Sequence, residues 1–177
     1  RLMQSKNYIQ TLLQPYFIEW ISVKYTAKPK VLSTMFDLYK LNRMAHKLMR
    51  IHWFDMIHCR SYIPALVGLE LKKKFGCKML FDMRGFWADE RIDGGLWNLN
   101  NPLFRSIYNF FKSKEKHILD KTDHTVSLTE NAAQLIKSGN LAGKFNGRIS
   151  VIPCCVDNSL FDPHIITGER KNELRSY

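Results

Sequence analysis

The sequence lacks several features that would place it in a well-known class of protein. Its four cysteines form no C-x-x-C pair and show no even spacing, which argues against a zinc knuckle or a secreted disulfide framework. No stretch reaches the roughly eighteen apolar residues of a membrane-spanning helix. Neither G-x-G-x-x-G nor G-x-x-x-x-G-K-[ST] occurs, which disfavours a dinucleotide or nucleoside-triphosphate cradle. The six histidines have no partners at metal-ligand spacing, so we predict neither a metal site nor a cofactor.

Negative charge is also scarce. Lysine and arginine outnumber aspartate and glutamate by 27 to 16, which gives a net charge of +11. The cations form short clusters, such as Lys72, Lys73 and Lys74, without a long basic arm. This pattern suits an anionic membrane surface or an anionic substrate at least as well as nucleic acid, and we expect no nucleic-acid partner. Two interpretations stay open, a solvated cationic face and peripheral attachment at the inner face of a membrane. A reducing cytoplasm is the expected location.

What the sequence does contain predicts one compact α/β domain. Hydrophobic residues make up 45% of the chain, enough to fill a core. Helical spacing and capping residues alternate along the chain with short apolar, β-branched runs. Short strands separated by helices favour a Rossmann-like, open and mainly parallel sheet with helices on both faces. The predicted strands are 16–23, 54–59, 78–83, 124–128 and 149–152, and the predicted helices are 2–13, 31–50, 61–76, 103–121 and the one that Thr129 caps.

Ligands of such sheets collect at the carboxyl ends of the strands. Three segments lie there, residues 59–62, 83–90 and 128–131. The middle one falls within FDMRGFWADE, which crowds charge, aromatic surface and a glycine into ten positions directly after a buried strand. We therefore expect the main ligand contacts to come from this segment.

The stretch VIPCCVDNSLFDP, residues 151–163, resembles the interdomain crossing of GT-B glycosyltransferases of the group-1, family-4-like type. The order of the upstream motifs supports this resemblance: a strand ending HCRS, a strand ending DMRG, a helix with KSKEKHIL, and then KTDHTVSLTENAAQLI. The resemblance covers nearly the whole chain. It implies that residues 1–163 form the amino-terminal, acceptor-side domain and that residues 164–177 begin the linker to a donor-binding domain. The helix at 2–13 starts without a preceding strand, so we expect the first strand of the sheet to be missing.

The resemblance also implies a function. The parent enzyme would transfer a sugar from a nucleotide-sugar donor to a saccharide or lipid-linked acceptor, with retention of configuration and without a bound metal, in the synthesis of cell-surface polysaccharide or glycolipid. The donor would bind mainly through the second domain, and the isolated chain would be inactive. The alternative is a non-catalytic Rossmann-like module that binds a ligand or nucleotide.

Arg84 stands where many related enzymes carry a histidine that contacts the reacting sugar. An arginine stays protonated and cannot act as a general base, but its planar fork suits an acceptor phosphate or a donor diphosphate. Asp89 or Glu90 would then orient an acceptor hydroxyl. A structural pairing of Arg84 with Asp82 or Glu115 is the competing interpretation.

The remaining candidates divide into ligand-binding and structural positions. Trp87 and Phe86 either stack on a sugar or pack the loop. Glu115 lies on the apolar stripe of its helix, which favours a hydrogen-bonding anchor over a catalyst. The other predicted substrate-binding residues are Arg60, Ser61, Gly85, Thr129 and Glu130, and the predicted hinge residues are Pro153, Asp157 and Phe161.

Overall fold

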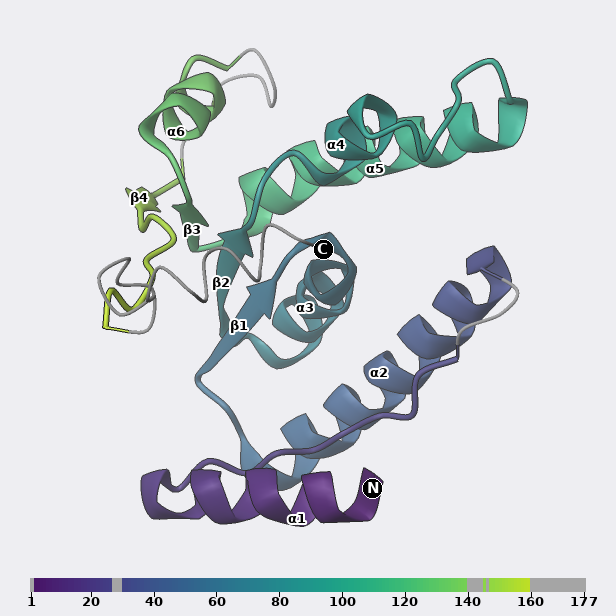
Figure 1. Cartoon of the computed structure of the whole chain (residues 1–177). Helices are drawn as coiled ribbons and strands as arrows, with labels where there is room; N and C mark the ends of the chain where they lie inside the picture. Colours follow the sequence, from purple (N-terminus) through teal and green to yellow (C-terminus); the bar gives the residue numbers. More distant parts are fainter. Residues whose placement is uncertain (1, 27–29, 140–144, 146, 160–177) are drawn as a thin grey trace, which may run out of the picture.

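The computed structural model of the chain describes residues 2–26, 30–139, 145 and 147–159 (Figure 1). Phe161 and the expected linker 164–177 lie outside the described residues.

Four parallel strands form one sheet in the order β1-β2-β3-β4. The strands are β1 (Met56–Arg60), β2 (Lys78–Met83), β3 (His124–Ser127) and β4 (Ile149–Val151). In register, Arg60 lies opposite Asp82, and Met83 lies opposite Ser127. The carboxyl ends of the strands therefore share one edge of the sheet, as the alternation of elements predicted. Strand β1 lies at one end of this order, and no described strand pairs with its other side, where we expected a strand to be missing.

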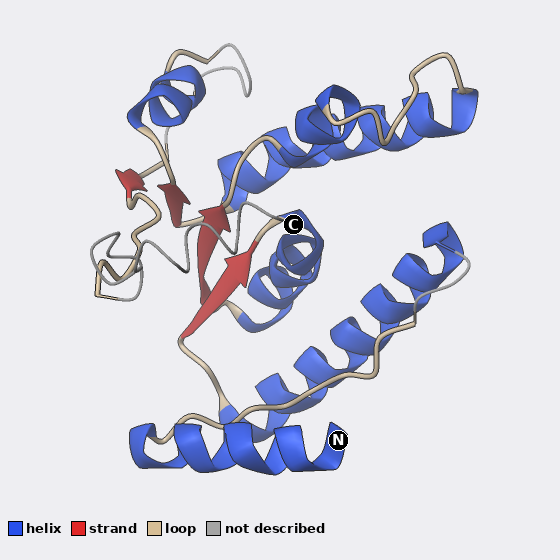
Figure 2. Ribbon diagram, viewed as in Figure 1, coloured by secondary structure: helices blue, strands red, loops and turns tan. Residues whose placement is uncertain are grey.

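Helices α3 (Tyr62–Phe75) and α6 (Glu130–Lys137) contact the sheet, and α5 (Pro102–Lys121) packs on α3 and joins the same hydrophobic core as β2 (Figure 2). They bury alternate residues of β2, Met79, Phe81 and Met83, because successive side chains of a strand point to opposite faces. Full burial of each such side chain contributes about 1.5–3 kcal/mol. Leu80 and Asp82, on the other face, are only partly buried. The α/β class and the open parallel sheet are thus confirmed, but the described helices cover one face of the sheet, whereas helices were expected on both.

Helix α2 (Lys30–His52) forms a further layer, because it packs on α3 rather than on the sheet (Figure 1). Its apolar residues Leu38, Leu41, Ala45 and Met49 recur at helical spacing and join a second cluster with α3. Helix α1 (Leu2–Leu13) is followed directly by the short 3-10 helix Gln14–Tyr16, which it contacts (Figure 1). Within the described ranges, no helix combines the length and the apolar character needed to cross a bilayer.

One prediction of secondary structure was wrong, and one helix was missed. Residues 16–23 were expected to form a strand, but Gln14–Tyr16 form a short 3-10 helix and the chain then runs without regular structure along α2. The aromatic and β-branched composition of this run is not sufficient for a strand that lacks a pairing partner. Conversely, helix α4 (Trp87–Asp93) was not predicted, and it contains the acidic candidates Asp89 and Glu90.

The predicted helix ends are largely confirmed. Thr129 caps α6, since its hydroxyl accepts a hydrogen bond from the amide of Ala132 at 3.2 Å. Gly76 ends α3 in the left-handed conformation with φ 72°. Ser61 occupies the N-cap position of α3, but its side chain makes no capping hydrogen bond.

Candidate functional site

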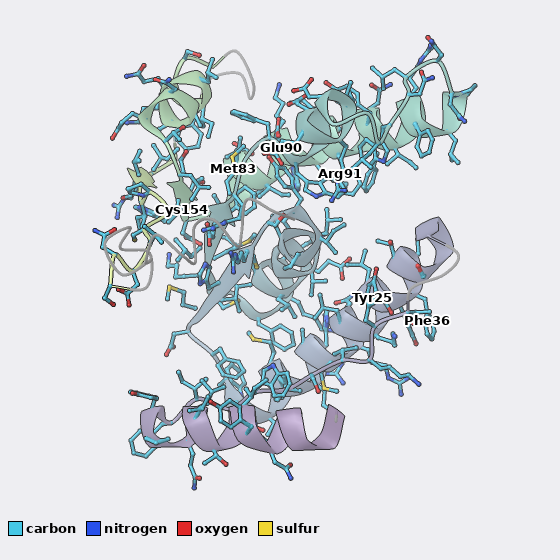
Figure 3. The ribbon with its side chains drawn as sticks, in the orientation of Figure 1. Tyr25, Phe36, Met83, Glu90, Arg91 and Cys154 are labelled. Carbon is cyan, nitrogen blue, oxygen red and sulfur yellow. The ribbon has the colours of Figure 1, made fainter. Side chains whose placement is uncertain are left out.

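The segment after β2 turns sharply into α4 at Gly85. Its φ of +153° lies in a region that L side chains rarely adopt. A Cβ at this position would also lie 2.0 Å from Oε1 of Glu90. The missing side chain therefore allows the Glu90 carboxylate to lie directly against the turn. Figure 3 labels Glu90 on α4 and Met83, the last residue of β2.

Arg84 lies at this turn with 36% of its side chain exposed. Its Nη1 is 3.9 Å from Oδ2 of Asp82, and its Nη2 donates to Sγ of Cys154 at 3.3 Å. The ion pair with Asp82 is therefore long, and the contact with Cys154 joins the β2 turn to the segment after β4. Among the described contacts of Arg84 there is none to Glu115, so the predicted alternative pairing is present only with Asp82.

Asp89 faces helix α5. Its Oδ1 accepts from the hydroxyl of Tyr108 at 2.8 Å, and its Oδ2 accepts from Nζ of Lys112 at 2.9 Å. Both carboxylate oxygens are thus engaged with the protein. Of the two acidic candidates on α4, the exposed one is Glu90.

The contacts of Lys112 continue into the core. Its Nζ also donates to Oε1 of Glu115 at 2.6 Å, and Glu115 is only 1% exposed. Burial acts to lower the pKa of Lys112, but the hydrogen bonds to Glu115 and Asp89 outweigh it and raise that pKa, so the ammonium stays charged. One cation therefore bridges two carboxylates on α4 and α5.

Tyr62 completes this polar network from α3. Its hydroxyl donates to Oε2 of Glu115 at 2.6 Å and lies 3.2 Å from the carbonyl oxygen of Gly85. Burial, together with the nearby Glu115 carboxylate, raises the pKa of Tyr62 far above its usual value. The phenol therefore remains a neutral donor, and the network links the β2 turn to three helices.

The aromatic residues of the turn pack against the protein. The Trp87 ring centroid lies 4.6 Å from that of Phe111 and 5.3 Å from that of Trp97. The guanidinium carbon of Arg91 lies 4.9 Å from the Trp87 centroid. Phe86 is half-buried against the same core. These contacts correspond to the loop-packing alternative for Trp87 and Phe86.

The other strand ends add polar groups at the same edge of the sheet. Arg60 is exposed at the end of β1. Ser61 follows with φ 68°, and its amide donates to the carbonyl of Asp82 at 2.9 Å, which fixes the start of α3 against β2. At the end of β3, Thr129 and the exposed Glu130 open α6.

The segment after β4 carries the predicted hinge. Pro153 is exposed, and Oδ1 of Asp157 accepts from the amide of Ser159 at 2.9 Å and from its hydroxyl at 2.6 Å. Such an aspartate turn reverses the chain locally. Cys154 and Cys155 are exposed free thiols.

Sequence reasoning missed Tyr62, Tyr108 and Lys112. Only Lys112 carried a local signal, because it precedes Glu115 by one helical turn. No group of three histidine, cysteine or acidic side chains is placed to hold a metal ion in the described part of the chain.

Comparison with known proteins places this geometry in context. A search of curated proteins finds no match. Among solved structures, the chain is similar to sucrose-phosphate synthase from Thermosynechococcus elongatus, with a TM-score of 0.61 and 15% identity over 89% of this chain and 38% of that one. It is also similar to a glycosyltransferase from Rickettsia africae ESF-5, with a TM-score of 0.50 and 19% identity over 94% of this chain and 37% of that one.

These structural similarities support the fold alone, and the chain spans well under half the length of either structure. The family model for Glycosyltransferase Family 4 matches residues 10–160, which include all four strands and the turn at Arg84. The chain therefore belongs to glycosyltransferase family 4.

Proposed function

We propose that this chain is the acceptor-side domain of an enzyme that transfers a sugar from a nucleotide-sugar donor to a saccharide or lipid-linked acceptor. The match to the family model over residues 10–160 carries the proposal. We further propose that transfer retains the anomeric configuration and serves the synthesis of cell-surface polysaccharide or glycolipid. A second domain of the complete polypeptide would hold most of the donor, across a cleft from the carboxyl edge of the sheet.

Arg84 is the proposed ligand contact for an anionic group. Its guanidinium is partly exposed at the edge where α/β sheets bind ligands, and its one carboxylate contact among the described residues is long at 3.9 Å. The fork can pair two N–H groups with a phosphate of the acceptor or with the donor diphosphate. A weakly paired arginine is available for this role without the loss of a strong ion pair.

Glu90 is the proposed partner for an acceptor hydroxyl. It is exposed, and it lies against the Gly85 turn beside Arg84. An ionised carboxylate only accepts hydrogen bonds, so it would orient the hydroxyl by accepting a hydrogen bond from it. Asp89 has a positioning role instead, because Tyr108 and Lys112 already occupy both of its oxygens.

The proposed place of action is the inner face of the cytoplasmic membrane. The net charge of +11 attracts the chain to anionic lipid, and a lipid-linked acceptor would be presented there. Pro153, Asp157 and Phe161 are proposed to form the hinge between the two domains.

The test is an assay of the complete polypeptide that contains this chain against a panel of nucleotide sugars, with lipid extracts and oligosaccharides as acceptors. We expect one nucleotide sugar to be consumed in an acceptor-dependent manner. If no donor is consumed with any acceptor, the non-catalytic binding module becomes the better description. The 177-residue chain alone is the control: we expect calorimetry to detect no tight nucleotide-sugar binding, whereas submicromolar affinity would place the donor site in this half.

A further inference from the structure

Helix α2 presents a cationic and aromatic face that the proposed sugar-transfer site does not use. Phe36, Tyr39, Arg43, Lys47 and Arg50 follow one another at intervals of three or four residues, and all are exposed. This spacing places them on one side of the helix. The side that packs on α3 contains Leu38, Leu41, Ala45 and Met49. We call these five exposed residues, from Phe36 to Arg50 at the spacing just given, the α2 face.

A broad groove of about 1180 Å³ runs between the α2 face and the irregular segment that crosses it. Its charged lining residues are five cations, Lys24, Lys40, Arg43, Lys47 and Arg50, and one acid, Glu70. Glu70 accepts a hydrogen bond from Asn42 at 2.7 Å. The groove is therefore strongly positive.

Most of these cations have no acidic partner in the part of the chain that the structure describes. Lys40 pairs with Asp37 at 2.6 Å, but Arg43, Lys47 and Arg50 make no ion pair with any described carboxylate. At 1.5 Å of rise per residue, these three span about 10 Å of the helix. A row of unpaired cations of this length is attractive to a surface that carries many negative charges.

Aromatic side chains border the cations. Tyr25, on the crossing segment, is 78% exposed, and Phe36 and Tyr39 are 54% and 58% exposed. Figure 3 shows Tyr25 near Phe36, which belongs to the amino-terminal half of α2. Exposed aromatic groups next to lysine and arginine are typical of surfaces that rest at the headgroup level of a bilayer.

We propose that the α2 face is the surface by which the chain docks on anionic phospholipid. The proposal rests on the membrane association in the proposed function, and it identifies one surface in place of the lysine clusters at 72–74 and 112–116. The bilayer is favoured over nucleic acid because the aromatic rings and the exposed Met35 and Ile51 gain from contact with acyl chains but not from contact with phosphates. Since the apolar side of α2 is already packed on α3, electrostatic attraction dominates this docking.

The test measures sedimentation of the chain with phosphatidylcholine vesicles, with and without phosphatidylglycerol. We expect binding only to the anionic vesicles, and we expect it to weaken as salt shortens the range of the attraction. The patch variant Arg43→Glu/Lys47→Glu should lower the partition coefficient by about tenfold or more. Circular dichroism confirms that each variant is folded.

A matched control separates this surface from the overall charge. The variant Lys73→Glu/Lys116→Glu has the same net charge as the patch variant, 11 − 4 = +7, but it reverses two exposed cations elsewhere. We expect it to retain most of the binding. Equal loss in both variants would overturn the proposal, because diffuse charge would then explain the attachment. Absence of binding to anionic vesicles, or binding to duplex DNA alone, would also overturn it. None of these measurements requires a sugar, so they stand apart from the test of transferase activity.

Discussion

The buried carboxylate of Glu115 accepts a hydrogen bond from the hydroxyl of Tyr62 at 2.6 Å, although the two residues are 53 positions apart. The Tyr62 hydroxyl has a single proton, and its distance to the carbonyl of Gly85 is longer, 3.2 Å. The proton therefore belongs mainly to the Glu115 bond. Since Lys112 occupies the other oxygen of Glu115, the charge is paired without exposure to water. This arrangement makes Glu115 the anchor of the turn that carries Arg84.

Removal of either end of this bond should destabilise the fold. Tyr62→Phe leaves one oxygen of a buried carboxylate without a donor, which we expect to cost about 1–3 kcal/mol. Glu115→Gln removes the buried partner of Lys112 and should cost about 3 kcal/mol or more. Urea unfolding followed by circular dichroism measures both values.

Tyr108→Phe is the matched control for Tyr62→Phe. It removes the same kind of hydroxyl donor, but the carboxylate that loses this donor is Asp89, whose side chain is 34% exposed. Water can replace the lost donor there, so we expect a cost of less than about 1 kcal/mol. Equal costs for the two tyrosines would contradict the role of Glu115 as the buried anchor.

Gly85→Ala tests the turn. An alanine at this position would have to adopt an unfavourable φ, and its methyl group would displace the Glu90 carboxylate. We therefore expect a loss of roughly 1–3 kcal/mol in the free energy of unfolding. Gly76→Ala serves as a comparison, since Gly76 also has a positive φ but no atom lies within 4 Å of the added Cβ. A larger cost at Gly85 than at Gly76, partly relieved by Glu90→Ala, would support the close contact. Equal costs would assign the whole effect to backbone strain.

Much of the fold could be predicted from the sequence because the sheet segments are short apolar runs between strong helical patterns. The run at residues 78–83 follows this rule, and β2 has these bounds. Residues 16–23 have the composition of a strand, but no strand in the described ranges lies beside them to complete their hydrogen bonds. Helix α4 has seven residues and mixes charged with aromatic side chains, so it offers too few positions to reveal a helical period.

The candidate site, like the fold, could be predicted from the sequence only in part. The edge that carries Arg84 followed from the topology of parallel strands, which depends only on the order of the elements. The partners of Asp89 and Glu115 did not follow from it. Tyr62, Tyr108 and Lys112 reach these acids only after α3, α4 and α5 have packed, and no sequence spacing encodes contacts between Tyr62 on α3 and Glu115 on α5.

Asp123 should contribute to stability in a pH-dependent manner. Partial burial acts to raise its pKa, but hydrogen bonds from Lys72, the amide of Met79 and Lys78 outweigh it and lower the pKa to about 2. A carboxyl group with a depressed pKa in the folded state stabilises the protein above its unfolded pKa of 3.8. This stability is lost as the pH falls from near 3.8 through about 2. Urea unfolding at several pH values should show this decline, and Asp123→Asn should lack that part of the slope; an unchanged slope would exclude Asp123 as its source.

Substitution of Arg84 tests the proposed ligand contact most directly. In the complete enzyme, with the donor and acceptor that the panel identifies, Arg84→Ala should reduce turnover by about tenfold or more, equivalent to about 1.4 kcal/mol of transition-state stabilisation. Arg84→Lys retains the charge but lacks the planar fork, so we expect only partial recovery. Thermal stability should hardly change, because the ion pair with Asp82 is long and partly exposed. Arg105→Ala is the control, since Arg105 is an exposed arginine that donates to the Leu99 carbonyl away from this edge of the sheet, and it should leave turnover unchanged. Near-normal turnover with lowered thermal stability in Arg84→Ala would identify Arg84 as a structural partner of Asp82 and refute its role in binding.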